Sequence, residues 1–405
     1  MTFETDFLRT LGHISNFTKE TTGIPLIDAY FGPENLSPGK IIKPMSPEKQ
    51  LAQLDALIDR SRNIRDELKR VAIEADLESF KVIVKWVSGE NISFVKLVEG
   101  IFGITPPKFK QREIGKAQQI VKTACETFPG RDVFEKIVKW EQKSKVSGET
   151  LRKIVTTEFV ERTEEIKTLF EKRVFAYLST RIQNNGVVYK AVTGEPWAGY
   201  NYYQGNYMSI NAFNVDNTFN KDRLFFALFH EYEHHVANLF EEKYYREKNA
   251  LDLCAPLLHT KRNIIGEGTA NCAREFLEVP VKGENAKLVR ALTHLRNIVG
   301  LNVAYMQNVE GKDDETVVDY LSSEGFEPKE EARKNVRFSK PLTSTGKLNF
   351  FKPYIYTYYF GRKDYVLPTY VKARKKGKLK EFFRTLYLNP YSRSTATWKT
   401  AFAHI

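Results

Sequence analysis

Two histidines four residues apart lie in an apolar stretch near the middle of the chain. His230 and His234 stand in residues 224–240 with Glu231 after the first of them, which is the spacing HExxH. On a helix the two imidazoles lie one turn apart on the same face, so both can bind one zinc ion. Glu231 lies about 100° further round the helix, where its carboxylate can activate a zinc-bound water as general base. The motif predicts a zinc-dependent hydrolase.

Context separates this motif from a chance match. With 7 His in 405 residues, a random HExxH arises on the order of once in a hundred such chains. The stretch around it is apolar on all sides, which predicts a buried helix. Buried imidazoles and carboxylates are costly unless a metal ion and hydrogen bonds satisfy them. We therefore favour a zinc site (Zn²⁺ as the cofactor) over an accidental pattern.

A catalytic zinc needs a third protein ligand and one open position. Glu267 is the nearest downstream candidate, since it lies between Gly266 and Gly268 and precedes a segment of helical character. The alternative is that Glu267 caps the start of that helix, where an acid is favourable. Other side chains nearby have different expected positions: Glu275 on a solvated face, His259 in a pocket, Cys272 in the core, and His235 as a structural residue or one that supports the ligands.

The elements that carry these residues are mostly helices. Apolar residues recur at three- and four-residue steps through 51–71 and 151–170, and Ser46-Pro47-Glu48 is typical of a helix start. Residues 186–192 and 207–213 predict short strands, and helical periodicity returns from about Asp222. We expect a mainly α fold with a small β-sheet next to the zinc helix. The expected organisation is an N-terminal helical region, 1–180, and a zinc-binding catalytic region, 181–405, with one intertwined domain as the alternative.

Composition limits the classes of partner. The formal charge is +12, but no nucleic-acid-binding signature accompanies it, so the basic run 372–380 is interpreted as a solvated loop leading into a helix. No apolar stretch approaches the roughly 20 residues that span a bilayer, and the N-terminus lacks the pattern of a signal peptide. Three cysteines without CxxC spacing favour a reducing compartment. We expect a cytoplasmic protein with no membrane or nucleic-acid partner.

Three blocks of the chain resemble a family of uncharacterised bacterial and archaeal HExxH proteins, distantly akin to the thermostable zinc carboxypeptidases. The blocks are residues 199–211, residues 230–235 with Glu267-Gly-Thr-Ala, and residues 354–361. The resemblance implies a helical metallopeptidase fold with a central cleft, zinc held by His230, His234 and Glu267, and carboxypeptidase activity. Two departures stand out. The family's Pro-Gly before a His-His pair is missing, which leaves His234 or His235 as the equivalent residue, and Asn302 replaces a family His.

Further roles follow from amide hydrolysis as the chemistry. An oxyanion needs a hydrogen-bond donor besides zinc, and matched to the family Tyr358 is the candidate. Arg362 could bind a substrate carboxylate, although aromatic clusters such as this one are usually core. An edge strand at 207–213 could pair with the substrate backbone, with contacts from the side chains of Asn206, Ser209 and Asn211. The alternative for that segment is a purely structural hairpin.

The sequence thus predicts a zinc metallopeptidase for short peptides, preferably a carboxypeptidase, with Glu231 activating a zinc-bound water. Two alternatives stay open. One is a zinc-containing binding protein without turnover, suggested by the positive charge and by Asn302. The other is a hydrolase of non-peptide amides, which would use the same groups. A retained general base argues against the first alternative, because a structural zinc has four protein ligands and needs no base.

Overall fold

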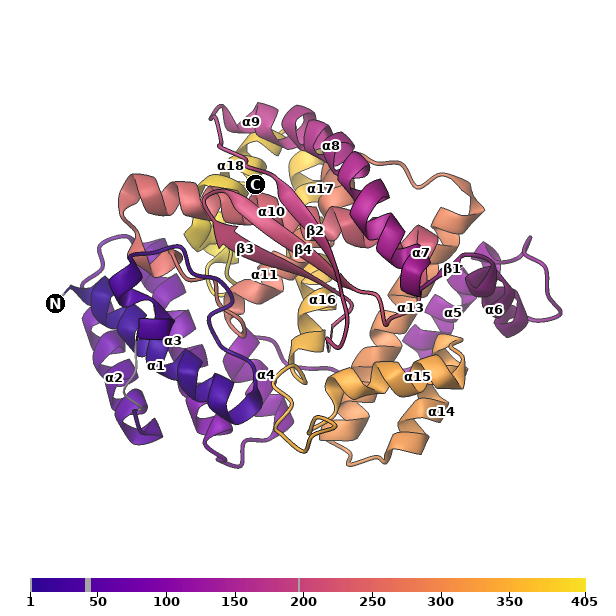
Figure 1. The fold of residues 1–405 in the computed structure, drawn as a ribbon, viewed down its shortest axis with the longest axis horizontal. Coiled ribbons are helices and arrows are strands. Elements are labelled where there is room, and N and C mark those ends of the chain that lie inside the picture. Colours follow the sequence, from indigo (N-terminus) through magenta and orange to yellow (C-terminus); the bar gives the residue numbers. More distant parts are fainter. Residues whose placement is uncertain (1, 41–44, 196) are drawn as a thin grey trace.

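The computed structural model describes residues 2–40, 45–195 and 197–405, and it is mainly helical, as predicted (Figure 1). Helices of the first part of the chain begin after capping residues such as Ser46 and Asp66, whose side chains accept backbone N–H bonds. These helices are α1 (Phe3–Thr22), α2 (Pro47–Ser61), α3 (Glu67–Val87), α4 (Phe94–Phe102), α5 (Gln111–Ala124), α6 (Val133–Lys143), α7 (Gly148–Lys153), α8 (Phe159–Phe170) and α9 (Ala176–Leu178).

The second part of the chain is built around α10, the long helix that carries His230 and His234. Its helices are α10 (Lys221–Lys248), α11 (Lys261–Ala270), α12 (Ala273–Phe276), α13 (Gly283–Asn308), α14 (Asp314–Gly325), α15 (Lys329–Asn335), α16 (Thr357–Phe360), α17 (Leu367–Lys375), α18 (Leu379–Leu388) and α19 (Trp398–Ala401). The basic run 372–380 covers the end of α17 and the turn into α18, so its first half is helical rather than a loop.

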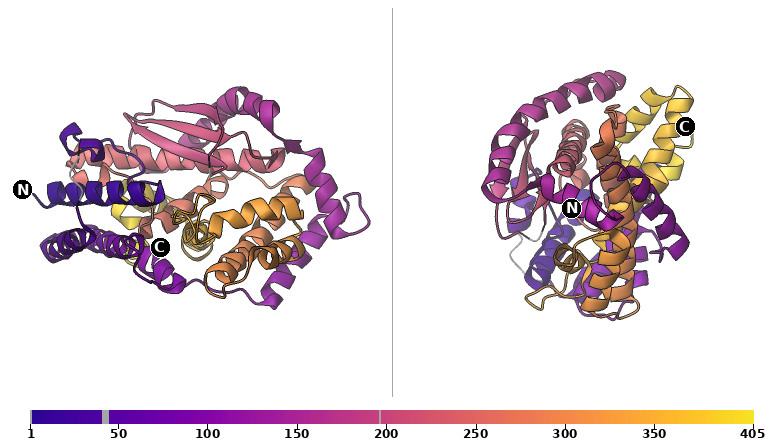
Figure 2. Two further views of the ribbon diagram at one scale, coloured as in Figure 1. Left: turned by 60° about the horizontal axis from the view of Figure 1, so that its bottom comes forward. Right: turned by 90° about the vertical axis from the view of Figure 1, so that its right-hand side faces the viewer.

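A three-stranded sheet lies against α10 (Figures 1 and 2). Its strands are β2 (Val187–Val192), β3 (Gly199–Gly205) and β4 (Met208–Asn214), in the order β2-β4-β3. β4 pairs parallel with β2 and antiparallel with β3. A separate pair, β1 (Lys145–Val146) and β5 (Phe219–Asn220), is antiparallel. The expectation that 207–213 forms an edge strand is wrong, because β4 is the central strand and β3 takes the edge.

The helix α10 begins and ends where its sequence allows. Asn220 caps the first turn by accepting hydrogen bonds from the backbone N–H groups of Asp222 and Arg223, at 3.0 and 3.2 Å. Asn249 ends the helix in the left-handed conformation, with a φ of 51°. Between these caps much of the helix is buried, and the buried residues include the polar side chains of Glu231, Glu233, His235 and Glu242.

The segment after α1 closes over one side of α10. It runs antiparallel to residues 254–258: the backbone N–H of Asp28 donates to the carbonyl of Pro256 at 2.9 Å, and Ile27 forms a bridge with Leu257. Residues from the beginning of the chain therefore reach the same region as the HExxH helix, more than two hundred positions away.

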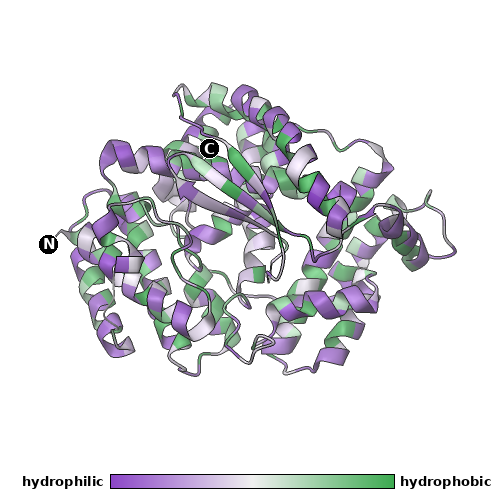
Figure 3. Ribbon diagram, in the orientation of Figure 1, coloured by the Kyte–Doolittle hydropathy of each residue, from purple (hydrophilic) through white to green (hydrophobic). Residues whose placement is uncertain are grey.

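One large cluster of buried apolar side chains extends from Phe7 to Ile405 and includes members of both predicted regions. Apolar and polar residues alternate along the helices, so most helices present one apolar face to this core (Figure 3). Cys125, Cys254 and Cys272 are buried and unpaired. Among the described residues, no helix is both long and apolar enough to cross a membrane.

Candidate metal centre

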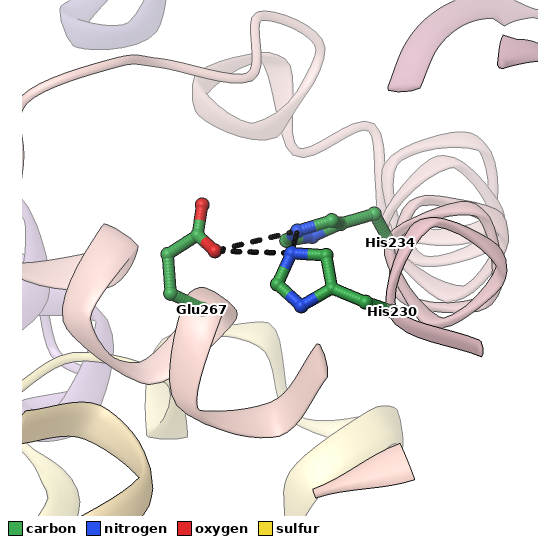
Figure 4. A group of neighbouring side chains, drawn as sticks. All are labelled: His230, His234 and Glu267. Atoms are coloured by element: carbon green, nitrogen blue, oxygen red, sulfur yellow. Dashed lines mark hydrogen bonds and ion pairs between the residues drawn. The ribbon is translucent and has the colours of Figure 1, made fainter. Parts of the chain in front are cut away.

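The side chains of His230, His234 and Glu267 converge from two helices (Figure 4). The two Nε2 atoms lie 3.1 Å apart. Oε2 of Glu267, on α11, lies 3.2 Å from Nε2 of His230 and 3.7 Å from Nε2 of His234. The structure thus brings together the three residues that the sequence singled out as metal ligands.

These separations fit a tetrahedral zinc. Zinc–ligand bonds of about 2.0–2.1 Å place neighbouring ligand atoms about 3.3 Å apart, close to the three distances found. Oε2 of Glu267 is buried and accepts no hydrogen bond of good geometry, although both imidazole nitrogens are near. Three acceptor atoms facing one point, one of them without a donor, suit a shared cation better than hydrogen bonds among themselves.

Electrostatics at this point also favour a cation. Burial alone would lower the pKa of His234, but the neighbouring carboxylates, Glu267 foremost, raise it to about 9. Burial raises the pKa of Glu267, yet the two histidines outweigh burial and hold that pKa well below its usual range. Without a metal, the pair formed by His234 and Glu267 therefore retains a proton. A divalent cation would displace this proton on binding.

Asn271 orients the first ligand. Its Oδ1 lies 3.1 Å from Nδ1 of His230, and its Nδ2 donates to the backbone carbonyl of Tyr358 at 2.9 Å. Because the amide Nδ2 is a donor to Tyr358, Oδ1 accepts from the Nδ1–H of His230. This tautomer leaves the Nε2 lone pair of His230 free to bind a metal.

Glu231 lines the same pocket and is 8% exposed. Burial raises the pKa of its carboxyl group, although His230 and His234 oppose this rise. A Cβ atom at Gly199, on β3, would lie 3.4 Å from Oε1 of Glu231, so the glycine lets the edge strand approach the carboxylate closely. A partly desolvated carboxylate beside the ligands is suited to general-base chemistry.

Helix α11 holds Glu267 in place at the end of its second turn. The helix begins at Lys261, where Thr260 and Asn263 form a capping box; the alternative that Glu267 caps a helix start is therefore wrong. Gly268 packs against Gly361: a Cβ at Gly268 would lie 2.3 Å from the carbonyl carbon of Gly361, and a Cβ at Gly361 would lie 1.7 Å from the Ile264 oxygen. This backbone contact sets the position of α11.

Two tyrosines of one helical turn face the centre. The hydroxyl of Tyr354 donates to Oε1 of Glu267 at 2.8 Å, which leaves Oε2 for the metal. Tyr358 also lines the pocket, and its neighbours there include Glu267 and Glu231. Burial raises the pKa of both hydroxyls well above the usual tyrosine value. Both are therefore protonated at neutral pH, and the role of Tyr358 as catalytic donor stays a prediction for a residue that lines this pocket.

The pocket around the centre has a volume of 230 Å³. Its wall combines the edge strand, the HExxH helix, α11 and the segment after α1. Beside the ligands it presents Asp28, whose Oδ1 accepts a hydrogen bond from the hydroxyl of Tyr200. Burial raises the pKa of Asp28 to about 6, although the Tyr200 hydrogen bond and His234 lower it.

His235 faces away from the centre. Its Nδ1 lies 2.8 Å from Oγ of Ser209 and its Nε2 lies 3.0 Å from Oδ1 of Asn184. Burial lowers its pKa to about 3, so the imidazole is neutral and joins α10 to the sheet. His234, rather than His235, therefore shares the centre with His230.

The side chains predicted to contact substrate have other positions. Ser209 is buried against His235, and Asn211 accepts a hydrogen bond from the amide of Asn201 within the sheet. Asn206 lies in the β3–β4 turn with a φ of 55°, and its backbone N–H donates to Glu242. Arg362 bonds the carbonyl of Asn271 and pairs with Glu275. These four are outside the lining of the pocket, where β3 supplies Gly199, Tyr200 and Asn201 instead.

Two further candidates are core residues. His259 is fully buried and stacked on Phe350, whose carbonyl accepts a hydrogen bond from its Nε2 at 2.6 Å. Asn302 is 1% exposed and bonds both the N–H and the carbonyl of Phe109. Asn302 therefore has a structural task that joins α13 to the segment before α5.

Sequence reasoning missed three residues of the site. Asn271 follows Glu267 by four positions, and Tyr354 precedes Tyr358 by four; this helical spacing was a usable signal for both. Asp28 had no such signal, because it reaches the pocket only through the contacts of its segment with residues 254–258.

Comparisons with known proteins bear on the fold. No protein-family model matches the chain, and no curated protein sequence matches it. A protein of Colwellia psychrerythraea described as a "putative lipoprotein" matches in structure with a TM-score of 0.52 and 13% identity, covering 89% of this chain and 67% of that one. A "putative lipoprotein of unknown function" from Shewanella oneidensis matches with a TM-score of 0.47 and 15% identity, covering 90% and 74%. At this identity, the Colwellia protein is similar to the chain in overall fold, and function has to be argued from the site.

Proposed function

We propose that the protein is a zinc-dependent metallopeptidase of the two-histidine, one-glutamate class. The observation that supports it most is the convergence of His230, His234 and Glu267 beside the carboxylate of Glu231 in one pocket. Among the described residues, no fourth His, Cys, Asp or Glu joins the ligand group. Three protein ligands with an open position are typical of catalytic zinc, whereas structural zinc has four.

The residues of the site would divide the chemistry between them. Zinc, when bound, would act as a Lewis acid and lower the pKa of water. Glu231 would accept the proton of the attacking water and pass it to the leaving amine. Tyr358, kept protonated by burial, would donate a hydrogen bond to the developing oxyanion. Asn271 and Tyr354 would hold His230 and Glu267 in position.

The pocket favours short, extended substrates. A volume of 230 Å³ accommodates about one side chain and its backbone. The free edge of β3 could pair with an extended backbone, strand to strand. Carboxypeptidase action would also need a cation for the terminal carboxylate. Arg262 and Arg393 line the pocket and are the nearest guanidinium groups among the described residues, but they already pair with Asp76 and Glu241, so a substrate carboxylate would have to share them.

The test compares wild type with Glu231→Gln and with Glu233→Gln as matched control. Glu233 lies on the same helix and is also buried, but it bonds Tyr387 and does not line the pocket. We expect near-stoichiometric zinc in all three proteins. Wild type and Glu233→Gln should cleave a mixed library of short peptides, and Glu231→Gln should lose at least about a hundredfold in kcat/KM.

The outcomes separate the alternatives. Cleaved ends identify exo- or endopeptidase action. Loss of zinc from the purified wild type, with no recovery when zinc is added back, would contradict the metal centre itself. Stoichiometric zinc with no peptide cleavage would favour a hydrolase of non-peptide amides or a zinc-containing binding protein. The binding protein, if it recognises anionic partners, should show salt-sensitive association.

A further inference from the structure

Asp28 is an acid in the pocket wall. Its carboxylate accepts a hydrogen bond from the hydroxyl of Tyr200, and among the described residues no Lys or Arg pairs with it. The carboxylate lies close enough to His234 and Glu267 to feel both charges. It enters the pocket from the segment after α1, so it lies across from the HExxH helix rather than on it.

The other charged residues that line the pocket are matched by partners. Glu241 pairs with Arg393, and Asp252 pairs with Lys69 at 3.0 Å. Arg262 pairs with Asp76 at 2.7 Å.

Glu267 faces the two histidines, and Glu231 is the proposed general base. Among the acids that line the pocket, Asp28 therefore has neither a Lys or Arg partner in the described residues nor a role in the proposed chemistry. A partly buried carboxylate with no Lys or Arg beside it among the described residues costs stability, and an acid of this kind in a pocket is a candidate functional residue.

Aromatic residues line the pocket together with this carboxylate, and Tyr200 bonds it through its hydroxyl. The ring of Trp197 lies 5.5 Å from that of Tyr200, which in turn lies 4.6 Å from that of Tyr202. Trp197, Tyr200 and Tyr358 all line the pocket. A pocket that holds both a carboxylate and aromatic rings suits an organic cation, because ring faces carry negative potential.

We propose that Asp28, with Trp197 and Tyr200, forms a subsite for an organic cation of the substrate beside the metal centre. The cation is an ammonium or guanidinium group, supplied either by a free amino terminus or by a Lys or Arg side chain next to the scissile bond. The choice of a peptide as substrate rests on the proposed function; the presence of a cation subsite does not.

A binding experiment tests the cation subsite independently of peptide hydrolysis. The protein is zinc-loaded Glu231→Gln, which keeps the pocket without turnover. Three probes are titrated by calorimetry: L-leucinamide with an α-ammonium group, Nα-acetyl-L-lysinamide with a cationic side chain, and neutral Nα-acetyl-L-leucinamide. We expect at least one cationic probe to bind about tenfold or more tightly than the neutral probe, as for a desolvated charge pair. In Glu231→Gln/Asp28→Asn this preference should fall to about twofold or less.

The relative affinities of the three probes identify the source of the cation. Preference for L-leucinamide indicates trimming from the amino end, and preference for the lysine probe indicates cleavage next to basic residues. No preference in the first protein, or a preference that survives Asp28→Asn, would overturn the subsite; the second result would mean that the amine coordinates zinc or contacts another group.

Two controls protect the interpretation. Asp55→Asn removes the same charge from an exposed residue that pairs with Lys81, and should leave the preference unchanged. Asp28→Asn should melt no lower than its parent at pH 8, because it removes an uncompensated, desolvated charge. If wild type retains zinc and cleaves no peptide, the proposed function fails, while the binding result still decides the subsite.

Discussion

At the scale of single residues, the centre depends on side chains that touch the ligands as much as on the ligands. Asn271 fixes the tautomer of His230, Tyr354 bonds Oε1 of Glu267, and the ring nitrogens of His235 bond Ser209 in the sheet and Asn184 in the loop before it. Each of these contacts fixes a tautomer or a side-chain orientation that the HExxH motif alone does not specify. Predictions at this scale concern metal affinity and local stability separately.

Asn271→Ala should weaken zinc binding by about 10–100-fold, because His230 loses the acceptor that holds its Nδ1–H. The measurement is competition for zinc with a chromophoric chelator. Asn302→Ala is the matched control: Asn302 is also a buried amide, and its bonds are to Phe109 and Tyr320. We expect that control to lower stability without changing zinc affinity; equal zinc affinities in both variants would contradict the role of Asn271.

His234→Ala and His235→Ala should differ in kind. His234→Ala removes a ligand and should reduce zinc to a small fraction of the stoichiometric amount. His235→Ala should keep zinc but lose about 1–3 kcal/mol of unfolding free energy, since Ser209 and Asn184 lose a buried partner. Zinc analysis and urea denaturation check both variants. If His235→Ala loses zinc and His234→Ala keeps it, His235 rather than His234 is the ligand.

At the scale of elements, the centre lies where α10 and α11 meet. Glycines allow the close backbone contacts that position α11. Gly268 and Gly361 bring α11 against the start of the π-helical segment Gly361–Val366, and Gly199 lets β3 approach Glu231. Because no side chain lies between Gly268 and Gly361, backbone packing fixes the position of α11, and the hydrogen bond from Tyr354 then orients the Glu267 carboxylate.

Gly361→Ala should lower the unfolding free energy by about 1–3 kcal/mol or more and also weaken zinc binding. The new methyl group would meet the Ile264 oxygen, so α11 must shift and move Glu267 with it. Gly266→Ala on the same helix is the control: its Cβ meets nothing within 4 Å, and it should stabilise the helix by about 0.5–1 kcal/mol. Melting curves with and without zinc distinguish the two; identical behaviour would contradict the packing argument.

At the scale of the whole molecule, the pocket is assembled from segments far apart in the chain. Asp28 comes from the segment after α1, Gly199 from the sheet, the histidines from α10, and Tyr354 from the turn before α16. The same core that joins these segments also buries ionisable groups. His259 is one of them, and burial lowers its pKa to about 3.

His259 predicts a loss of stability in mild acid. The folded state excludes a proton that the unfolded chain binds below pH 6.5, so the contribution of this group is complete above pH 6.5 and is lost as the pH falls towards 3. One such histidine adds a slope of up to about 1.4 kcal/mol per pH unit. His259→Phe should make the dependence of unfolding free energy on pH shallower between pH 6 and 4. An unchanged slope would mean that His259 titrates normally in the folded protein.

The sequence by itself determined the fold class and the candidate ligands of the centre. Period-3.6 patterns predicted the helices, including that of His230 and His234, because an apolar face follows directly from spacing. The strands at 187–192 and 208–214 were predicted within a residue, whereas β3 was not, since its Gly, Asn and Tyr residues have no clear alternation. Glu267 was found as a candidate because glycines flank it.

Only the tertiary structure decided which way each side chain faces and what lies opposite. It turned His234 towards Glu267 and His235 towards the sheet, placed β4 in the centre of the sheet, paired Arg362 with Glu275, and brought Asp28 into the pocket. These outcomes depend on contacts between residues far apart in sequence. Local propensity carries no information about such contacts, because their free energy arises only when the segments pack together.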